Sequence, residues 1–180
     1  MNVHLARRAA GDVRSVCRCA SPSAATRWIA SLVARLPECA RSRSLSPADR
    51  TWAHTGARFR TSNDAVVLLP AAYTAGAREM YCRNVYLRTG LTMPTTRWVV
   101  DLDANSGLFS VWAAVTGARV IAVEAQEGFA PLVRALAKHN GVAEALYVEI
   151  AMAGGEHLGG TVGIVADDLR WSATSQGALT

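Results

Sequence analysis

The sequence predicts an α/β fold organised around one parallel β-α-β unit, and three neighbouring segments carry this prediction. Residues 98–102 form a short apolar run, which is typical of a strand buried on both faces of a parallel sheet. Residues 108–115 repeat apolar side chains at helical spacing, and Gly117 follows as a stop signal. Residues 119–123 are rich in β-branched side chains and lead to Glu124. A strand, a helix and a second strand therefore follow one another here.

The turn between the first strand and the helix, residues 103–107, lies where such units bind a nucleotide cofactor. A dinucleotide would need glycine at the positions that hold Asp103, Asn105 and Leu108. A carboxylate in this turn would also repel a diphosphate. A cofactor with a cationic centre and no phosphate fits better, and S-adenosylmethionine, a sulfonium, is the candidate. A β-α-β unit that binds no ligand is the alternative.

This stretch resembles the FkbM-type family of S-adenosylmethionine-dependent methyltransferases, whose first motif reads VDxGANxGLFS. The matching residues are Asp101, Ala104, Asn105, Gly107, Leu108, Phe109 and Ser110, with Glu124 at the acidic position after the second strand. The resemblance runs from about Glu79 to the C-terminus, and Asp103 departs from it by replacing the turn glycine. It implies a Rossmann-like three-layer αβα methyltransferase fold. That fold is expected to be incomplete on its C-terminal side, because the chain stops before the later strands.

The resemblance also implies a cofactor site and a reaction. The implied site residues are Asp101, Asp103, Ala104, Asn105, Gly107, Glu124 and Ala151. The turn would hold the methionine part of S-adenosylmethionine, Glu124 would bind the ribose hydroxyls, and Ala151 would lie beside adenine. The expected reaction is methyl transfer to a hydroxyl oxygen of a small molecule or sugar, with no catalytic base and no metal site identified. The alternative is a truncated cofactor-binding remnant without activity.

Charge is distributed unevenly along the 180 residues, whose formal net charge is +5. Residues 1–62 hold eleven arginines against three acidic residues, a net +8, whereas residues 63–180 carry a net −3. We therefore expect a basic, helical or irregular N-terminal extension and linker over 1–62, and the methyltransferase domain over 63–180. Nucleic-acid binding is not expected, because no stacking aromatic residues are interleaved with the arginines.

Further elements are predicted on both sides of the central unit. Ser21 and Pro22 predict the start of an amphipathic helix that Pro37 closes, and residues 37–62 have the composition of a loosely ordered linker. The remaining predictions are a strand at 66–69, a helix within 76–87, a helix that Asn140 and Gly141 end, a third parallel strand at 146–150, and one more strand at 161–165.

Cysteine usage and hydropathy predict a cytoplasmic protein with a ragged N-terminus. Cys17, Cys19, Cys39 and Cys82 form no paired CxxC motif, and we expect them to be free thiols in a reducing compartment. No apolar stretch has the length of a signal peptide or a membrane span. In the related fold the first strand is central, so a chain without the fourth strand would leave an apolar sheet edge free. Such an edge predicts self-association.

Overall fold

The computed structural model describes residues 3–73, 76–87 and 91–151. The helices are α1 (Val3–Cys19), α2 (Pro22–Ala34), α3 (Leu36–Ser42), α4 (Ser46–Thr55), α5 (Leu108–Val115) and α6 (Ala130–His139). The strands are β1 (Ala57–Arg60), β2 (Val66–Leu69), β3 (Trp98–Leu102), β4 (Arg119–Glu124) and β5 (Leu146–Ile150). Three short turns of helix complete the elements: η1 (Arg78–Cys82), η2 (Glu127–Phe129) and η3 (Ala143–Ala145).

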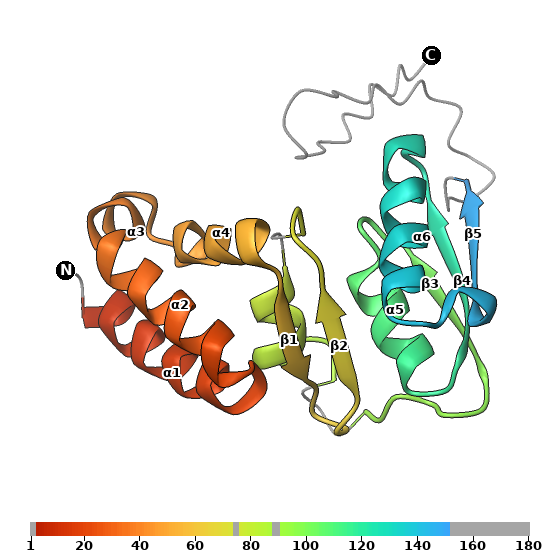
Figure 1. Cartoon of the computed structure of the whole chain (residues 1–180), viewed down its shortest axis with the longest axis horizontal. Coiled ribbons are helices and arrows are strands. Elements are labelled where there is room, and N and C mark those ends of the chain that lie inside the picture. The colour runs from red at the N-terminus through yellow and green to blue at the C-terminus, as the bar shows by residue number, and fades with distance from the viewer. Residues whose placement is uncertain (1–2, 74–75, 88–90, 152–180) are drawn as a thin grey trace, which may run out of the picture.

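The elements stack in layers along the long axis of the molecule (Figure 1). Helices α1–α4 form one end, and the antiparallel hairpin of β1 and β2 follows. Next come α5 and α6, which lie between this hairpin and a three-stranded parallel sheet. The strand order is β3-β4-β5, so β4 is central. The chain is therefore a mixed α/β protein with a parallel sheet, as its sequence predicts.

The central β-α-β unit is confirmed. β3, α5 and β4 occupy the predicted segments, and β4 pairs in parallel with β3 from Trp98↔Arg119 to Leu102↔Val123. The helix after Glu124 and the third parallel strand are also confirmed, as α6 and β5. The predicted strand at 161–165 lies outside the described residues.

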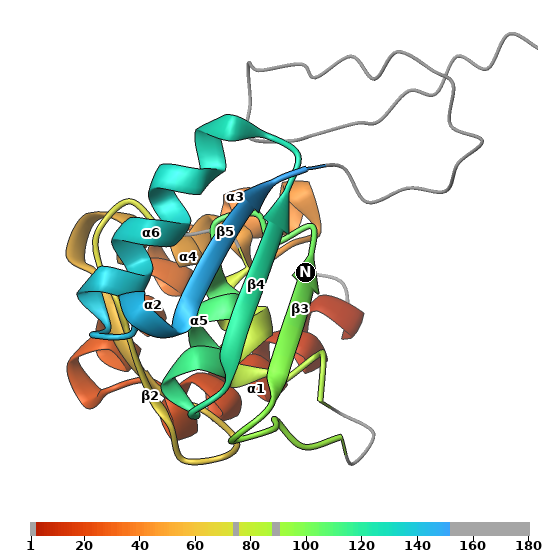
Figure 2. The same ribbon diagram turned by 90° about the vertical axis from the view of Figure 1, so that its right-hand side faces the viewer.

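The prediction that β3 is buried on both faces is wrong for the described residues. Helices α5 and α6 cover only one face of the sheet, and Figure 2 looks onto the other face, with the three strands in front of the helices. Along β3 the exposed side chains Trp98, Val100 and Leu102 alternate with half-buried ones. β3 is an edge strand, and the second helical layer of the expected αβα arrangement is not found among residues 3–73, 76–87 and 91–151.

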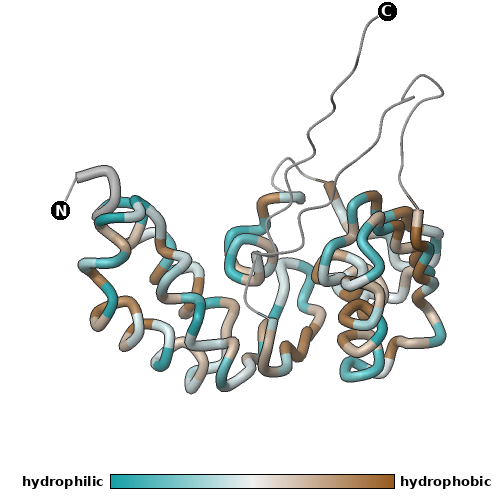
Figure 3. Tube along the Cα trace, turned by 90° about the horizontal axis from the view of Figure 1, so that it is seen from above, coloured by the Kyte–Doolittle hydropathy of each residue, from teal (hydrophilic) through white to brown (hydrophobic). Residues whose placement is uncertain are grey.

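The N-terminal third is more ordered than predicted. The ragged N-terminus is helix α1, and the expected loose linker at 37–62 contains α3, α4 and β1. Hydrophobic residues alternate with hydrophilic ones along these helices (Figure 3). In α4 the apolar positions are few, but Ala48 and Trp52 are buried one turn apart, which is enough to anchor the helix. Among the described residues, no helix combines the length and the apolar character needed to cross a membrane.

A continuous chain of aromatic rings connects the N-terminal helices to the sheet-bearing part. Ring centroids lie 5.0–6.2 Å apart along Trp28, Trp52, Phe59, Tyr81 and Trp112, distances typical of favourable aromatic pairs. The two parts thus share one hydrophobic core. The domain boundary expected between residues 62 and 63 falls in the turn between the paired strands β1 and β2.

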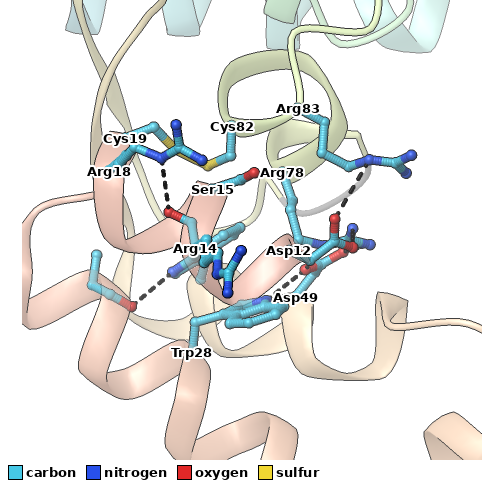
Figure 4. The surroundings of a disulfide bond; sticks show 12 residues. Asp12, Arg14, Ser15, Arg18, Cys19, Trp28, Asp49, Arg78, Cys82 and Arg83 are labelled. Carbon is cyan, nitrogen blue, oxygen red and sulfur yellow. Dashed lines mark hydrogen bonds and ion pairs between the residues drawn. A yellow bond between two sulfur atoms is a disulfide. The ribbon is translucent and has the colours of Figure 1, made fainter. Parts of the chain in front are cut away.

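A buried ion cluster fixes η1, the short π-helical turn found inside the predicted helix at 76–87 (Figure 4). Arg78 is 2% exposed and donates to Asp12 of α1 at 2.6 Å and to Asp49 of α4 at 2.9 Å. The indole of Trp28 donates to the same Asp49 at 2.7 Å. Burial raises the pKa of Asp49, although Arg78 and Trp28 oppose this shift. The cluster joins α1, α2, α4 and η1.

The expectation of four free thiols is wrong for two of the cysteines. Cys19 at the end of α1 and Cys82 at the end of η1 form a disulfide, with their Cα atoms 5.3 Å apart (Figure 4). Cys17 and Cys39 are free, the first exposed and the second buried. The sequence does not reveal the pair, because 63 positions separate Cys19 from Cys82, and only the packing of α1 on η1 brings them together.

Candidate functional site

The predicted site residues meet at one place, the carboxyl ends of the three parallel strands. The turn of residues 103–107 follows β3, Glu124 ends β4, and Ala151 follows β5. Two backbone bonds extend the sheet there: Ala104 donates to the carbonyl of Val123 at 3.0 Å, and Ala151 donates to that of Glu124 at 3.1 Å. Open parallel sheets commonly bind ligands at this edge.

The turn has left-handed backbone at three positions: φ is 65° at Asp103, 51° at Asn105 and 81° at Gly107. Asp and Asn tolerate this region better than most residues. At Gly107 an added Cβ would lie only 2.9 Å from Cγ1 of Val133 and 3.2 Å from its Cα. The glycine is therefore required by the close approach of α6, whatever contact it makes with a ligand.

Glu124 holds this turn against the segment that follows β4. Its side chain is 1% exposed. One carboxylate oxygen accepts the backbone N–H of Asn105 at 2.7 Å, and the other accepts that of Gln126 at 2.8 Å. Such charge-assisted bonds are about twice as strong as neutral ones. Glu124 thus positions the turn, and its contact with a ribose stays a prediction.

Asp101 and Asp103 give the edge a concentrated negative charge. Burial raises the pKa of Asp101, and the neighbouring Asp103 and Glu124 raise it further, while a hydrogen bond from Ser110 opposes the shift. Loss of hydration also raises the pKa of Asp103, with a contribution from Glu124. The carboxylates destabilise one another's charge, so this edge favours a cationic ligand over an anionic one.

Two supporting residues were not among the predicted site residues. Ser110 lies in the first turn of α5 and donates its hydroxyl to Asp101, and its place in the matched motif is the sequence signal that could have identified it. Tyr81 donates its hydroxyl to the carbonyl of Leu108 at 2.9 Å and is buried, which raises its pKa far above the usual range. No sequence signal connects Tyr81 with α5.

A cavity of about 550 Å³ lies apart from this edge and is lined by none of the predicted site residues. Its lining includes Asn63, Thr95 and Thr116, which places it near the start of β3 and the end of α5. Within the described ranges, His, Cys, Asp and Glu side chains form no group of three that could hold a metal ion.

No family model, curated protein or solved structure matches the chain. The functional conclusion therefore rests on the motif and on the geometry of the carboxyl edge.

Proposed function

We propose that the chain is an S-adenosylmethionine-dependent methyltransferase of the FkbM type, with a Rossmann-like fold, and that it methylates a hydroxyl group of a small molecule or sugar. The observation that supports this most is the convergence of Asp101, Asn105, Glu124 and Ala151 at the carboxyl edge of a parallel sheet. These residues come from three strands, and the resemblance to the family concerns the same positions.

The chemistry of the residues present fits this cofactor. Burial, and after it the neighbouring Asp103 and Glu124, raises the pKa of Asp101, so a sulfonium or ammonium group beside Asp101 would stabilise its carboxylate, whereas a phosphate would destabilise it further. When bound, S-adenosylmethionine supplies a methyl group on an activated sulfonium leaving group. Asp101 and Asn105 would hold its methionine end, and Glu124 would keep the Asn105 backbone in place. The protein's remaining task is to align the acceptor hydroxyl with the methyl carbon.

Calorimetric titration with S-adenosylmethionine tests the proposal, and Asn105→Gly is the informative variant. Glycine tolerates the left-handed backbone and keeps the N–H that Glu124 accepts, but it removes the side-chain oxygen that accepts the Ser106 N–H at 2.7 Å together with the contact to the cofactor. We expect binding by the parent and binding about tenfold or more weaker by the variant, roughly 1.4 kcal/mol. Glu144→Gln, an exposed substitution in η3, is the control and should bind like the parent. Absence of binding by the parent would refute the proposal.

A catalytically inactive remnant that still binds the cofactor is the second candidate. Two observations favour it: Asp103 occupies the position of the turn glycine, and both oxygens of Glu124 are already bonded to backbone. Methyl transfer to a panel of hydroxylated small molecules and sugars separates the two candidates. Binding together with formation of S-adenosylhomocysteine and a methylated product supports the enzyme, whereas binding without turnover on the whole panel supports the remnant.

We propose the cytoplasm from the sequence alone, and the Cys19–Cys82 disulfide is an observation against it that makes the location testable. Structural disulfides are rare in the cytosol. Rapid acid quenching of cells and alkylation of thiols should find Cys19 and Cys82 reduced if the protein is cytoplasmic. A fully oxidised pair would contradict this location.

A further inference from the structure

A cavity of about 250 Å³ gathers positive charge where α1 ends, α2 begins and the β1–β2 hairpin passes them. Among the described residues, its lining includes Arg18, Arg58 and Arg60, here called the cavity arginines, and no acidic residue. Arg18 lies in the last turn of α1. Arg58 and Arg60 flank the buried Phe59 in β1 and are exposed, so their side chains share the outer face of the hairpin. Two elements therefore bring three cations to one place.

The N-terminal third holds only three acidic residues, and all of them are engaged elsewhere. Asp12 and Asp49 both bind the buried Arg78. Glu38 binds Arg50 at 2.7 Å. Within the described ranges, none of these three carboxylates pairs with a cavity arginine. The uneven charge of the sequence thus has a local counterpart in the structure.

One cavity arginine has a counter-charge in the described part of the chain, and its ion pair is loose. Arg60 lies 3.8 Å from Asp64, and both side chains are exposed, so this pair contributes little. Arg18 donates its Nε to the backbone carbonyl of Arg14 at 3.4 Å, and neither Arg18 nor Arg58 forms an ion pair with a described residue. Like charges without a counter-ion repel one another, so the cavity favours an anion.

The walls of the cavity are fixed by bonds outside the arginine side chains. The backbone N–H of Ser21 donates to the carbonyl of Arg58 at 2.8 Å, which holds the start of α2 against β1. The disulfide of Cys19 fixes the end of α1 next to Arg18 (Figure 4). Ser21, the N-cap of α2, makes no side-chain capping bond, and the first turn of α2 has no acidic residue. The positive end of this helix therefore adds to the charge of the arginines.

We propose that this cavity binds a phosphate group, either as the free ion or as the monoester of a small molecule. Guanidinium groups are suited to phosphate because their N–H donors match two oxygens of a tetrahedral anion at once. The cavity is smaller than the roughly 300–1,000 Å³ of pockets for drug-sized ligands, so it fits a phosphate with a short organic part. None of the predicted cofactor residues lines it, and the proposal is independent of the proposed methyl transfer.

Two substitutions of Ser21 test the role of charge without disturbing the helix. Asp and Asn are N-caps as good as Ser, so Ser21→Asp and Ser21→Asn should both retain α2. Only Ser21→Asp adds a negative charge to the cavity wall. We expect glycerol phosphate, titrated by calorimetry in chloride buffer, to bind about tenfold or more weakly to Ser21→Asp than to Ser21→Asn. Equal affinities would overturn the proposal.

Thermal unfolding of the same two variants separates lost binding from a damaged fold. Ser21→Asp should not lower the midpoint of the free protein, because a carboxylate is favourable at the N-terminus of a helix. Glycerol phosphate should raise the midpoint of the parent and of Ser21→Asn by mass action, and raise that of Ser21→Asp much less. A ligand that leaves the midpoint of the parent unchanged, together with no calorimetric signal, would overturn the proposal.

An arginine pair separates a local site from the overall positive charge. Arg58→Gln removes one cavity arginine, and Arg134→Gln removes an exposed arginine of α6, so both variants have the same net charge. We expect glycerol phosphate to bind about tenfold or more weakly to Arg58→Gln, and to bind Arg134→Gln like the parent. Comparable weakening by both substitutions would assign the effect to net charge and overturn the site.

A comparison of ligands identifies the source of the phosphate. Tighter binding of glycerol phosphate than of inorganic phosphate would support a monoester, because the organic part then adds contacts. Equal or tighter binding of inorganic phosphate, with the same loss in Arg58→Gln, would support the free ion. Tighter binding of a short single-stranded oligonucleotide, with a steep salt dependence, would assign the arginines to nucleic acid and overturn the proposal of a small ligand.

Discussion

At the scale of single residues, Asp103 and Gly107 in the turn after β3 both have left-handed backbone, but for different structural reasons. Gly107 is required because a side chain would collide with Val133, whereas Asp103 occupies a similar conformation in an exposed position. Packing against Val133 restricts which side chain position 107 can hold, whereas only the left-handed backbone restricts position 103.

Gly107→Ala should destabilise the fold. The methyl group would force left-handed backbone strain of about 1–3 kcal/mol and an overpacking cost of similar size against α6. Urea unfolding measures the loss. Gly128→Ala is the control, because nothing lies within 4 Å of a Cβ at that position. An equal, small effect of both substitutions would mean that α6 moves aside at little cost.

Asp103→Gly should relieve strain and remove a carboxylate from the turn. Under the proposed function we expect S-adenosylmethionine to bind about tenfold more tightly, roughly 1.4 kcal/mol, because charge effects of Asp103 on the cofactor's ammonium and carboxylate groups largely cancel. Calorimetry of both proteins at one ionic strength gives the comparison. Weaker binding by the glycine variant would show that Asp103 contributes a favourable contact.

The raised pKa of Asp101 predicts a definite pH dependence. Since the folded state binds this proton more tightly than the unfolded state, Asp101 contributes stability below its ordinary pKa of 3.8, and that contribution is lost as pH rises through the raised value. The free energy of unfolding of the parent relative to Asp101→Asn should therefore fall with rising pH across this window. Asp64→Asn, which removes an exposed carboxylate, is the control variant with which this pH dependence is compared. A difference that rises with pH would contradict the direction of the shift.

At the scale of elements, η1 connects the N-terminal helices α1 and α4 to α5, the helix that follows the turn of residues 103–107. Arg78 binds Asp12 and Asp49, Cys82 is bonded to Cys19, and Tyr81 holds the first residue of α5 through the carbonyl of Leu108. The five residues of this π-helical turn therefore carry contacts to α1, α4 and α5.

Removing the guanidinium of Arg78 should be costly, because it leaves Asp12 and Asp49 buried without a counter-charge. We expect Arg78→Ala to lower the free energy of unfolding by about 3–5 kcal/mol. Arg50→Ala breaks an exposed pair with Glu38 and should cost no more than about 1 kcal/mol. Denaturant titration of both variants tests the contrast, and comparable losses would show that the buried cluster is not specially dependent on Arg78.

At the scale of the whole molecule, one core and one covalent bond join the basic N-terminal third to the rest. The disulfide closes a long loop, so its removal should cost about 2–4 kcal/mol. Cys82→Ser should lower the midpoint of thermal unfolding, and a dithiol reductant should produce a similar drop in the parent. Cys17→Ser, at an exposed free thiol, should change neither. Insensitivity of the parent to reductant would indicate that the bond adds no stability.

What the sequence by itself determined is the unit from β3 to β5, with its bounds, its parallel order and its carboxyl edge. These features depend on periodicity within short segments and on turn residues such as Asn105 and Gly107, which are local properties. The tertiary structure alone decided the rest. Trp28, Trp52 and Phe59 make the N-terminal helices part of the core, and the bond from the Asn105 backbone holds the buried Glu124 against the turn after β3. Such contacts join residues far apart along the chain, or depend on which strand lies at the edge of the sheet, and neither leaves a periodic signal in the sequence.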